Sequence, residues 1–110
     1  MTRVLLGDFD ALVRLGFRDV FRRVDVELLE ADTLDILARL VESMPDVVLL
    51  DLDKDGVISL AQRIASEFPA VKVIACSSAT PTMRIFPPFH HGESYRSQLD
   101  PTRLTCAIHA

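Results

Sequence analysis

Aspartates gathered at two points of the chain are the residues whose type and spacing could carry out chemistry. They are Asp8, Asp10, Asp51, Asp53 and Asp55, and each group follows a short apolar segment. Carboxylates held in one crevice repel one another and are tolerated when a hard cation such as Mg²⁺ lies between them. A carboxylate beside Mg²⁺ can also accept a phosphoryl group, because the metal neutralises charge on the transferring oxygens. Since Gly7 and Gly56 adjoin these aspartates, turn formation explains them equally well.

Apolar periodicity predicts the elements that must position these aspartates. Strands are predicted at 2–6, 26–29, 47–50 and 71–76, with Tyr95 in a fifth strand and helices between them. Strands that alternate with helices favour an α/β fold, here a flavodoxin-like three-layer sandwich with a five-stranded parallel sheet. The carboxyl ends of parallel strands meet at one edge of the sheet. We therefore expect Asp8, Asp51 and Ser77 to lie together there, where a hydroxyl could hydrogen-bond a phosphoryl group.

The segment 79–91 departs from this pattern because it contains three prolines. A regular helix is not expected there, so the fourth helix of the fold is predicted to be irregular. The apolar side chains of this segment are Met83, Ile85, Phe86 and Phe89. They either fill the core or form an exposed patch that associates with another protein.

Length and charge limit the classes of function. The chain has 110 residues, which suits a single domain spanning 1–110, and its net charge of −4 argues against broad binding to nucleic-acid phosphates. It has no apolar run long enough to span a membrane and no secretory signal, so a cytoplasmic location is expected. Cys76 and Cys106 suit a reduced compartment and are expected to be buried. Arg14, Arg18 and Arg22 form a basic stripe that is either solvated or a docking face for an acidic partner.

Three stretches of the sequence carry a resemblance to a known family. The segment 3–8, followed by 11–17, resembles the opening of response-regulator receiver domains of the CheY-like superfamily. The likeness is closest to the LuxR/NarL-type subfamily of two-component systems. The segment 45–52 resembles the third strand of these domains with its phosphoacceptor, and 68–74 resembles the approach to their fourth strand. The resemblance covers nearly the whole chain and weakens after Ala79.

The resemblance implies roles for individual residues. Asp51 stands at the phosphoacceptor position and Asp8 at that of the first metal-binding acid, so Asp8, Asp51 and Asp53 stand where the family binds its metal, Asp53 at the position of a backbone carbonyl ligand. Ser77 stands at the hydroxyl switch position, and Tyr95 is the candidate for the switch aromatic of the fifth strand. In this family the face between the fourth and fifth helices mediates dimerisation. The resemblance therefore implies a homodimer through that face, which would include the apolar patch.

The departures from the family pattern lie at the same edge of the sheet. Phe9 replaces the second metal-binding acid, and Ser97 stands near the position of the family's phosphoryl-pairing lysine. Losing a charge-assisted contact of that kind costs about 1.5–3 kcal/mol. We therefore expect an atypical receiver that acts in signal transduction and transcription control through protein–protein interaction or dimerisation, independently of aspartyl phosphorylation. Its partners would be a second copy, a histidine kinase or another regulatory protein. DNA would be bound only by a separate C-terminal output domain of a longer regulator.

Other functions remain open. A conventional receiver would be phosphorylated on Asp51 with Mg²⁺ as its cofactor. A small phosphatase would use Asp51 as nucleophile and Asp53 as acid and base, although in the receiver interpretation we expect no enzymatic activity. The segment 51–62 also resembles the opening of a calcium-binding loop, but Gln62 stands where that loop requires a bidentate glutamate.

Overall fold

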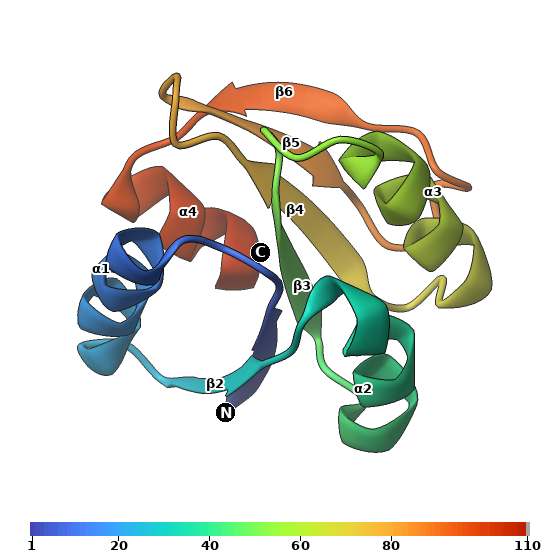
Figure 1. The fold of residues 1–110 in the computed structure, drawn as a ribbon, viewed down its shortest axis with the longest axis horizontal. Helices are drawn as coiled ribbons and strands as arrows, with labels where there is room; N and C mark the ends of the chain where they lie inside the picture. Colours follow the sequence, from blue (N-terminus) through green and yellow to red (C-terminus); the bar gives the residue numbers. More distant parts are fainter. Residues whose placement is uncertain (110) are drawn as a thin grey trace.

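Six strands form one mixed sheet with helices on both of its faces (Figure 1). The computed structural model describes residues 1–109. In chain order the elements are β1 (Thr2–Leu6), α1 (Ala11–Arg22), β2 (Val26–Glu30), a 3₁₀ turn (Thr33–Asp35), α2 (Ile36–Ser43), β3 (Val47–Asp51), α3 (Val57–Glu67), β4 (Lys72–Cys76), β5 (Thr82–Phe86), β6 (Tyr95–Gln98) and α4 (Pro101–His109).

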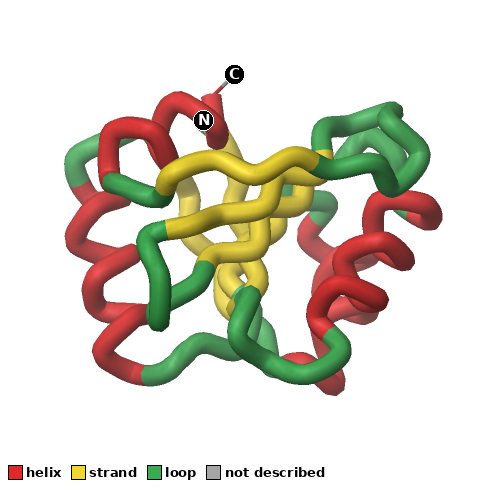
Figure 2. Tube along the Cα trace, turned by 90° about the horizontal axis from the view of Figure 1, so that it is seen from above, coloured by secondary structure: helices red, strands yellow, loops and turns green. Residues whose placement is uncertain are grey.

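The strand order is β2-β1-β3-β4-β5-β6, and the first four strands are parallel. Strand β5 pairs with β4 in the antiparallel direction, and β6 pairs with β5 in the antiparallel direction. Helices α1 and α4 cover one face of the sheet, and α2 and α3 cover the other (Figures 1 and 2). The fold is therefore a three-layer α/β arrangement, as the alternation of strands and helices predicts.

Two apolar clusters hold the three layers together. On the α1/α4 face, Val4, Leu49 and Ile74 from the sheet pack with Leu104 of α4. On the α2/α3 face, Leu5, Val48 and Val73 pack with helix residues such as Leu40 and Ile64. Strand β3 supplies both clusters because its residues Val47–Leu50 are apolar on both faces, which is typical of a central parallel strand.

The sheet differs from the predicted five-stranded parallel sheet in the segment 79–91. No helix lies between β4 and β6 in the described part of the chain, and Thr82–Phe86 form the antiparallel strand β5 instead. Met83, Ile85 and Phe86 are buried, so they are core residues and do not form the expected interaction patch. Phe89 is 68% exposed. The face between a fourth and a fifth helix, predicted to mediate dimerisation, is absent from the described residues because the first of those helices is replaced by a strand.

Smaller differences concern single side chains. Tyr95 lies in a strand, as predicted, but that strand is the sixth and is antiparallel. Cys76 is buried, whereas Cys106 is exposed, contrary to expectation, on the outer side of α4. Within residues 1–109, no helix combines the length and apolar character needed to cross a membrane.

Candidate functional site

The carboxyl ends of β1, β3 and β4 carry the predicted site residues, because the parallel arrangement brings these ends to one edge of the sheet. Asp8 follows β1, Asp51 ends β3, and Ser77 follows β4. A close approach of β1 and β3 precedes the site. The Gly7 amide donates a hydrogen bond to the Leu49 carbonyl oxygen at 2.8 Å. A Cβ at Gly7 would lie 3.0 Å from that oxygen, so any larger residue would crowd a backbone atom of β3.

Asp8 is held by two cationic side chains of the protein itself. Lys54 Nζ lies 3.0 Å from Asp8 Oδ2, and Arg14 Nη2 lies 3.3 Å from Asp8 Oδ1. Asp8 and Lys54 are about two-fifths exposed, at 39% and 40%. Together with Asp51 and Asp55 they line a cavity of about 180 Å³ between the end of β3 and the start of α3. The ammonium of Lys54 thus supplies positive charge at the position where the sequence predicts a metal ion.

Asp51 and Asp53 have different surroundings. Asp51 Oδ1 accepts a hydrogen bond from the Asp53 amide at 3.0 Å, which shapes the turn after β3. The Asp53 carboxylate accepts hydrogen bonds from Ser77 Oγ at 2.8 Å, from the Ser78 amide at 2.9 Å and from the Ala79 amide at 3.2 Å. The Ser77 hydrogen bond lowers the pKa of Asp53 below its ordinary value, and the two amide hydrogen bonds act in the same direction. Asp53 therefore ties the loop after β3 to the loop after β4.

The structure separates the predicted metal ligands. Asp8 and Asp51 line one cavity, whereas Asp53 lines a second cavity of about 280 Å³ with Ser77. Among residues 1–109, no group of three or more histidine, cysteine, aspartate or glutamate side chains could hold a metal ion. The residues present do not fit a Mg²⁺ ion, because the buried, apolar Phe9 supplies no second carboxylate and Asp8 is already paired with Lys54 and Arg14.

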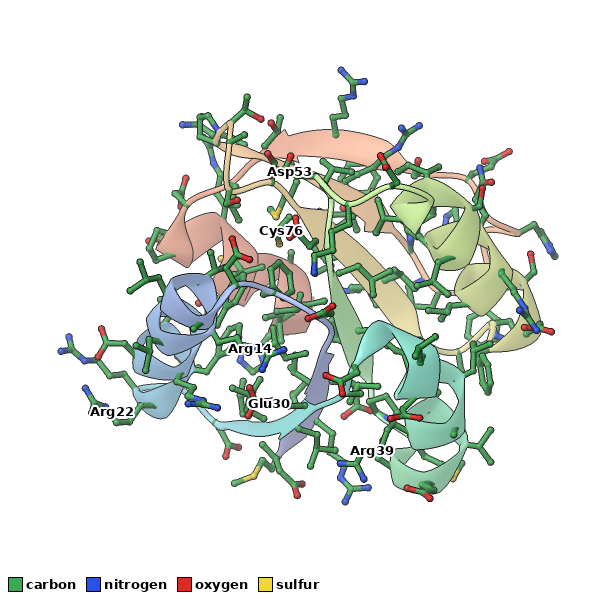
Figure 3. All side chains as sticks on the ribbon, in the orientation of Figure 1. Arg14, Arg22, Glu30, Arg39, Asp53 and Cys76 are labelled. Carbon is green, nitrogen blue, oxygen red and sulfur yellow. The ribbon has the colours of Figure 1, made fainter. Side chains whose placement is uncertain are left out.

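Phe9, at the position of the missing second acid, points into the core instead of the site. It is buried, and its ring contacts Phe17 edge to face at a centroid distance of 5.0 Å. Phe9 and Cys76 both line an apolar pocket of about 320 Å³ between α1 and α4. Burial raises the pKa of the Cys76 thiol to about 12, with a further contribution from the Asp51 carboxylate, so the thiol stays protonated. Figure 3 shows Cys76 and Asp53 near the same end of the sheet.

The remaining predicted positions lie on the edge strand β6. Tyr95 is half-exposed and pairs with Ile85, and Ser97 pairs with Met83. Neither side chain lines the cavity that contains Asp8 and Asp51 or the cavity that contains Asp53. Of the two predicted switch residues, only Ser77 contacts a predicted site aspartate in the described residues.

The sequence did not reveal the internal partners of the aspartates. Lys54 follows Asp51 by three residues and lies in the loop after β3. A lysine at this position could have indicated an ion pair with a carboxylate across the site.

The arginines of the basic stripe on α1 also form ion pairs with carboxylates of the protein itself. Arg14 pairs with Asp8, and Arg18 pairs with Glu30 of β2 at 2.6 Å. Figure 3 shows Arg14 and Glu30 projecting into the region between α1 and β2. Arg18 and Arg22 nevertheless remain largely exposed, at 51% and 71% of their side-chain surface.

The chain matches no protein-family model, and no curated protein matches it.

Proposed function

We propose that this chain is an atypical receiver-like regulatory domain that works through protein–protein contacts and does not use aspartyl phosphorylation. The fold supports the proposal in its first four strands. The order β2-β1-β3-β4, with helices on both faces, agrees with the first four strands of a flavodoxin-like order and supports that assignment. The resemblance of segments 3–8 and 45–52 to receiver domains points to the same class of protein.

The observation that carries the proposal is that the apolar Phe9 is buried in place of a second acid, while the remaining carboxylate, Asp8, is paired with Lys54. The 3.0 Å distance from Lys54 Nζ to Asp8 Oδ2 places a fixed positive charge on the carboxylate that a receiver uses to bind its metal. An ion pair this exposed contributes only about 0.2–1 kcal/mol, so it would not exclude a metal from an otherwise complete site. The site is incomplete, however, because Phe9 is buried in the core and supplies no second carboxylate. These features together disfavour a stable phosphoryl group on Asp51.

The direct test is the intact mass of the protein after incubation with Mg²⁺ and a small-molecule phosphodonor such as acetyl phosphate. The proposal expects no phosphoryl adduct on the wild-type protein, with folding checked by circular dichroism. Asp51→Asn is the matched control. An adduct that forms on the wild type and disappears in Asp51→Asn would overturn the proposal and favour a conventional receiver. Turnover of a phosphate ester that requires Asp51 would favour the phosphatase.

A protein partner belongs to the same proposal, but its contact surface must differ from the predicted one. Helix α1 exposes two large apolar side chains one turn apart, Leu12 at 83% and Leu15 at 57%. We propose that they contact a second copy or another regulatory protein. The test is the mass in solution by light scattering over a range of concentrations. A dimer that is weakened by Leu12→Ser supports contact through a second copy, and a dimer that is insensitive to this change contradicts the α1 surface.

A further inference from the structure

Two arginines of the β5–β6 hairpin, Arg84 and Arg96, are paired directly opposite each other. Side chains at directly opposite positions of an antiparallel pair lie on the same face, and like charges there are destabilising. Arginine remains protonated in proteins, so neither side chain can relieve the repulsion by losing its charge. The hairpin therefore contains an unfavourable pair that an anion between the two guanidinium groups would make favourable.

The other arginines of the protein show how unusual this pair is. Seven of the ten arginines pair with a carboxylate within 4.0 Å; they are Arg3, Arg14, Arg18, Arg22, Arg39, Arg63 and Arg103. In the described part of the chain, Arg84 and Arg96 have no such carboxylate. Arg84 Nε donates instead to Ser94 Oγ at 2.7 Å, which fixes its side chain across the hairpin. Arg84 is thus oriented but not neutralised, and Arg96 is exposed beside it.

Both arginines line the cavity of about 280 Å³ that also contains Asp53. Half-buried Leu52 and Ile58 form an apolar part of its wall. The Thr80 hydroxyl donates to Ser77 Oγ at 3.3 Å and lies 2.5 Å from the Thr82 hydroxyl, which can donate to it. With both hydroxyl protons engaged in this way, the guanidinium groups are the main donors available to a ligand. The Asp53 carboxylate is already bound to Ser77 and repels an anion, which directs the anionic group of a ligand away from Asp53 and toward the arginines.

We propose that this cavity binds a small organic phosphate monoester, held by Arg84 and Arg96. A guanidinium group can bind phosphate oxygens with two parallel hydrogen bonds. Two such groups carry two positive charges, so they match a phosphate dianion better than they match a singly charged carboxylate ligand. The apolar wall at Leu52 and Ile58 would contact the organic group of the ester. This site is separate from Asp51, so the inference does not depend on the function proposed above, and the phosphodonor experiment does not decide it.

The test is a titration of the ¹⁵N-labelled protein with phenyl phosphate, inorganic phosphate and benzoate, followed by NMR. We expect saturable changes at Arg84, Arg96 and Thr82, with phenyl phosphate binding more tightly than inorganic phosphate and benzoate binding weakest. Arg96→Gln should weaken phenyl phosphate binding by about tenfold or more, since it removes a charge-assisted contact. Arg23→Gln is the matched control, because Arg23 also lacks a carboxylate partner in the described residues but lies in the turn after α1.

Thermal melting gives a second readout that a purely structural role of Arg96 would not reproduce. Without phosphate, Arg96→Gln should raise Tm, because the repulsion with Arg84 is removed. With phenyl phosphate, the wild type should gain in Tm and Arg96→Gln should gain little. The proposal is overturned if the changes do not saturate, if they persist in Arg96→Gln, or if Arg23→Gln abolishes them equally.

Discussion

Two glycines show how the same residue type serves different purposes in this chain. At Gly7 an added Cβ would lie 3.0 Å from the Leu49 carbonyl oxygen and 3.2 Å from Leu50 Cδ2. At Gly16, inside α1, an added Cβ would have nothing within 4 Å. The first glycine permits the close approach of β1 and β3 that places Asp8 at the site. The second has no steric requirement and only weakens its helix.

Gly7→Ala and Gly16→Ala should therefore have opposite effects on stability. Gly7→Ala should lower the free energy of unfolding by about 1–3 kcal/mol, because a backbone oxygen cannot move aside easily. Gly16→Ala should raise it by about 0.5–1 kcal/mol through helix propensity. Urea unfolding followed by circular dichroism measures both. Equal effects of the two changes would contradict the crowding at Gly7.

Asp53 gives the protein a defined response to acid. Its pKa is lowered in the folded state, so the unfolded chain takes up a proton first as the pH falls. Its contribution to stability is present above the ordinary pKa of 3.8 and is lost as the pH falls through the lowered value. Asp53→Asn should lower the urea midpoint of unfolding near neutral pH. The further decrease of this midpoint between about pH 5 and pH 3 should be smaller in Asp53→Asn than in the wild type. Asp55→Asn removes a carboxylate of the same loop and is the control; an identical response of both variants contradicts the role of Asp53.

At the scale of elements, the strongly apolar strands could be predicted and the hairpin could not. Strand β3 begins where predicted because four consecutive apolar residues require burial on both faces. Strand β5 was missed, although its residues Thr82–Phe86 begin with an alternation of polar and apolar side chains that is typical of a strand. The prolines around it, and the resemblance to receiver domains, which have a helix at this point, favour an irregular helix instead. The site aspartates were located by the same reasoning, but their partners Lys54 and Ser78 depend on loop geometry that no periodicity encodes.

Helix α4 is joined to the sheet by a buried lysine. The Lys72 side chain is 9% exposed, and its Nζ donates to the Ala107 carbonyl oxygen at 2.5 Å in the last turn of the helix. Burial lowers the pKa of Lys72, whereas a positive charge at a helix C-terminus is favourable. Lys72→Ala should reduce the free energy of unfolding by about 1–3 kcal/mol and expose the α4 amides to hydrogen exchange.

The chain's other lysine provides the comparison for this prediction. Lys54→Ala removes an ammonium that is 40% exposed, so it should change stability by no more than about 1 kcal/mol. Chemical denaturation of both variants decides the matter. If Lys72→Ala lowers the free energy of unfolding no more than Lys54→Ala does, the stabilising role of the contact between Lys72 and α4 is contradicted.

At the scale of the whole molecule, one sheet separates two apolar cores. The Cα radius of gyration is 12.4 Å, close to the value of about 13 Å for a single domain of this length. Ile64 of α3 belongs to one core and Leu104 of α4 to the other. Because β3 contributes residues to both cores, loss of packing on one face of the sheet should also destabilise the core on the other face.

Ile64→Ala and Leu104→Ala should therefore shift one common unfolding transition. Each should cost about 2–5 kcal/mol, since each creates a cavity beside a central strand. Far-UV circular dichroism and hydrogen exchange of amides on both faces report the transition. Separate transitions for the two faces, or a variant that loosens only its own face, would contradict this coupling.

The most direct test of the proposed function is a Mg²⁺ titration of the ¹⁵N-labelled wild-type protein, followed at the amides of Asp8, Asp51 and Asp53. The structure predicts no saturable change up to well above about 1 mM, the weak end of the range for protein cation sites. The reason is that the buried Phe9 supplies no second carboxylate, and Asp8 Oδ2 already lies 3.0 Å from Lys54 Nζ. A saturable response at Asp8 and Asp51 that is lost in Asp51→Asn would contradict the account and restore a metal-dependent phosphoacceptor.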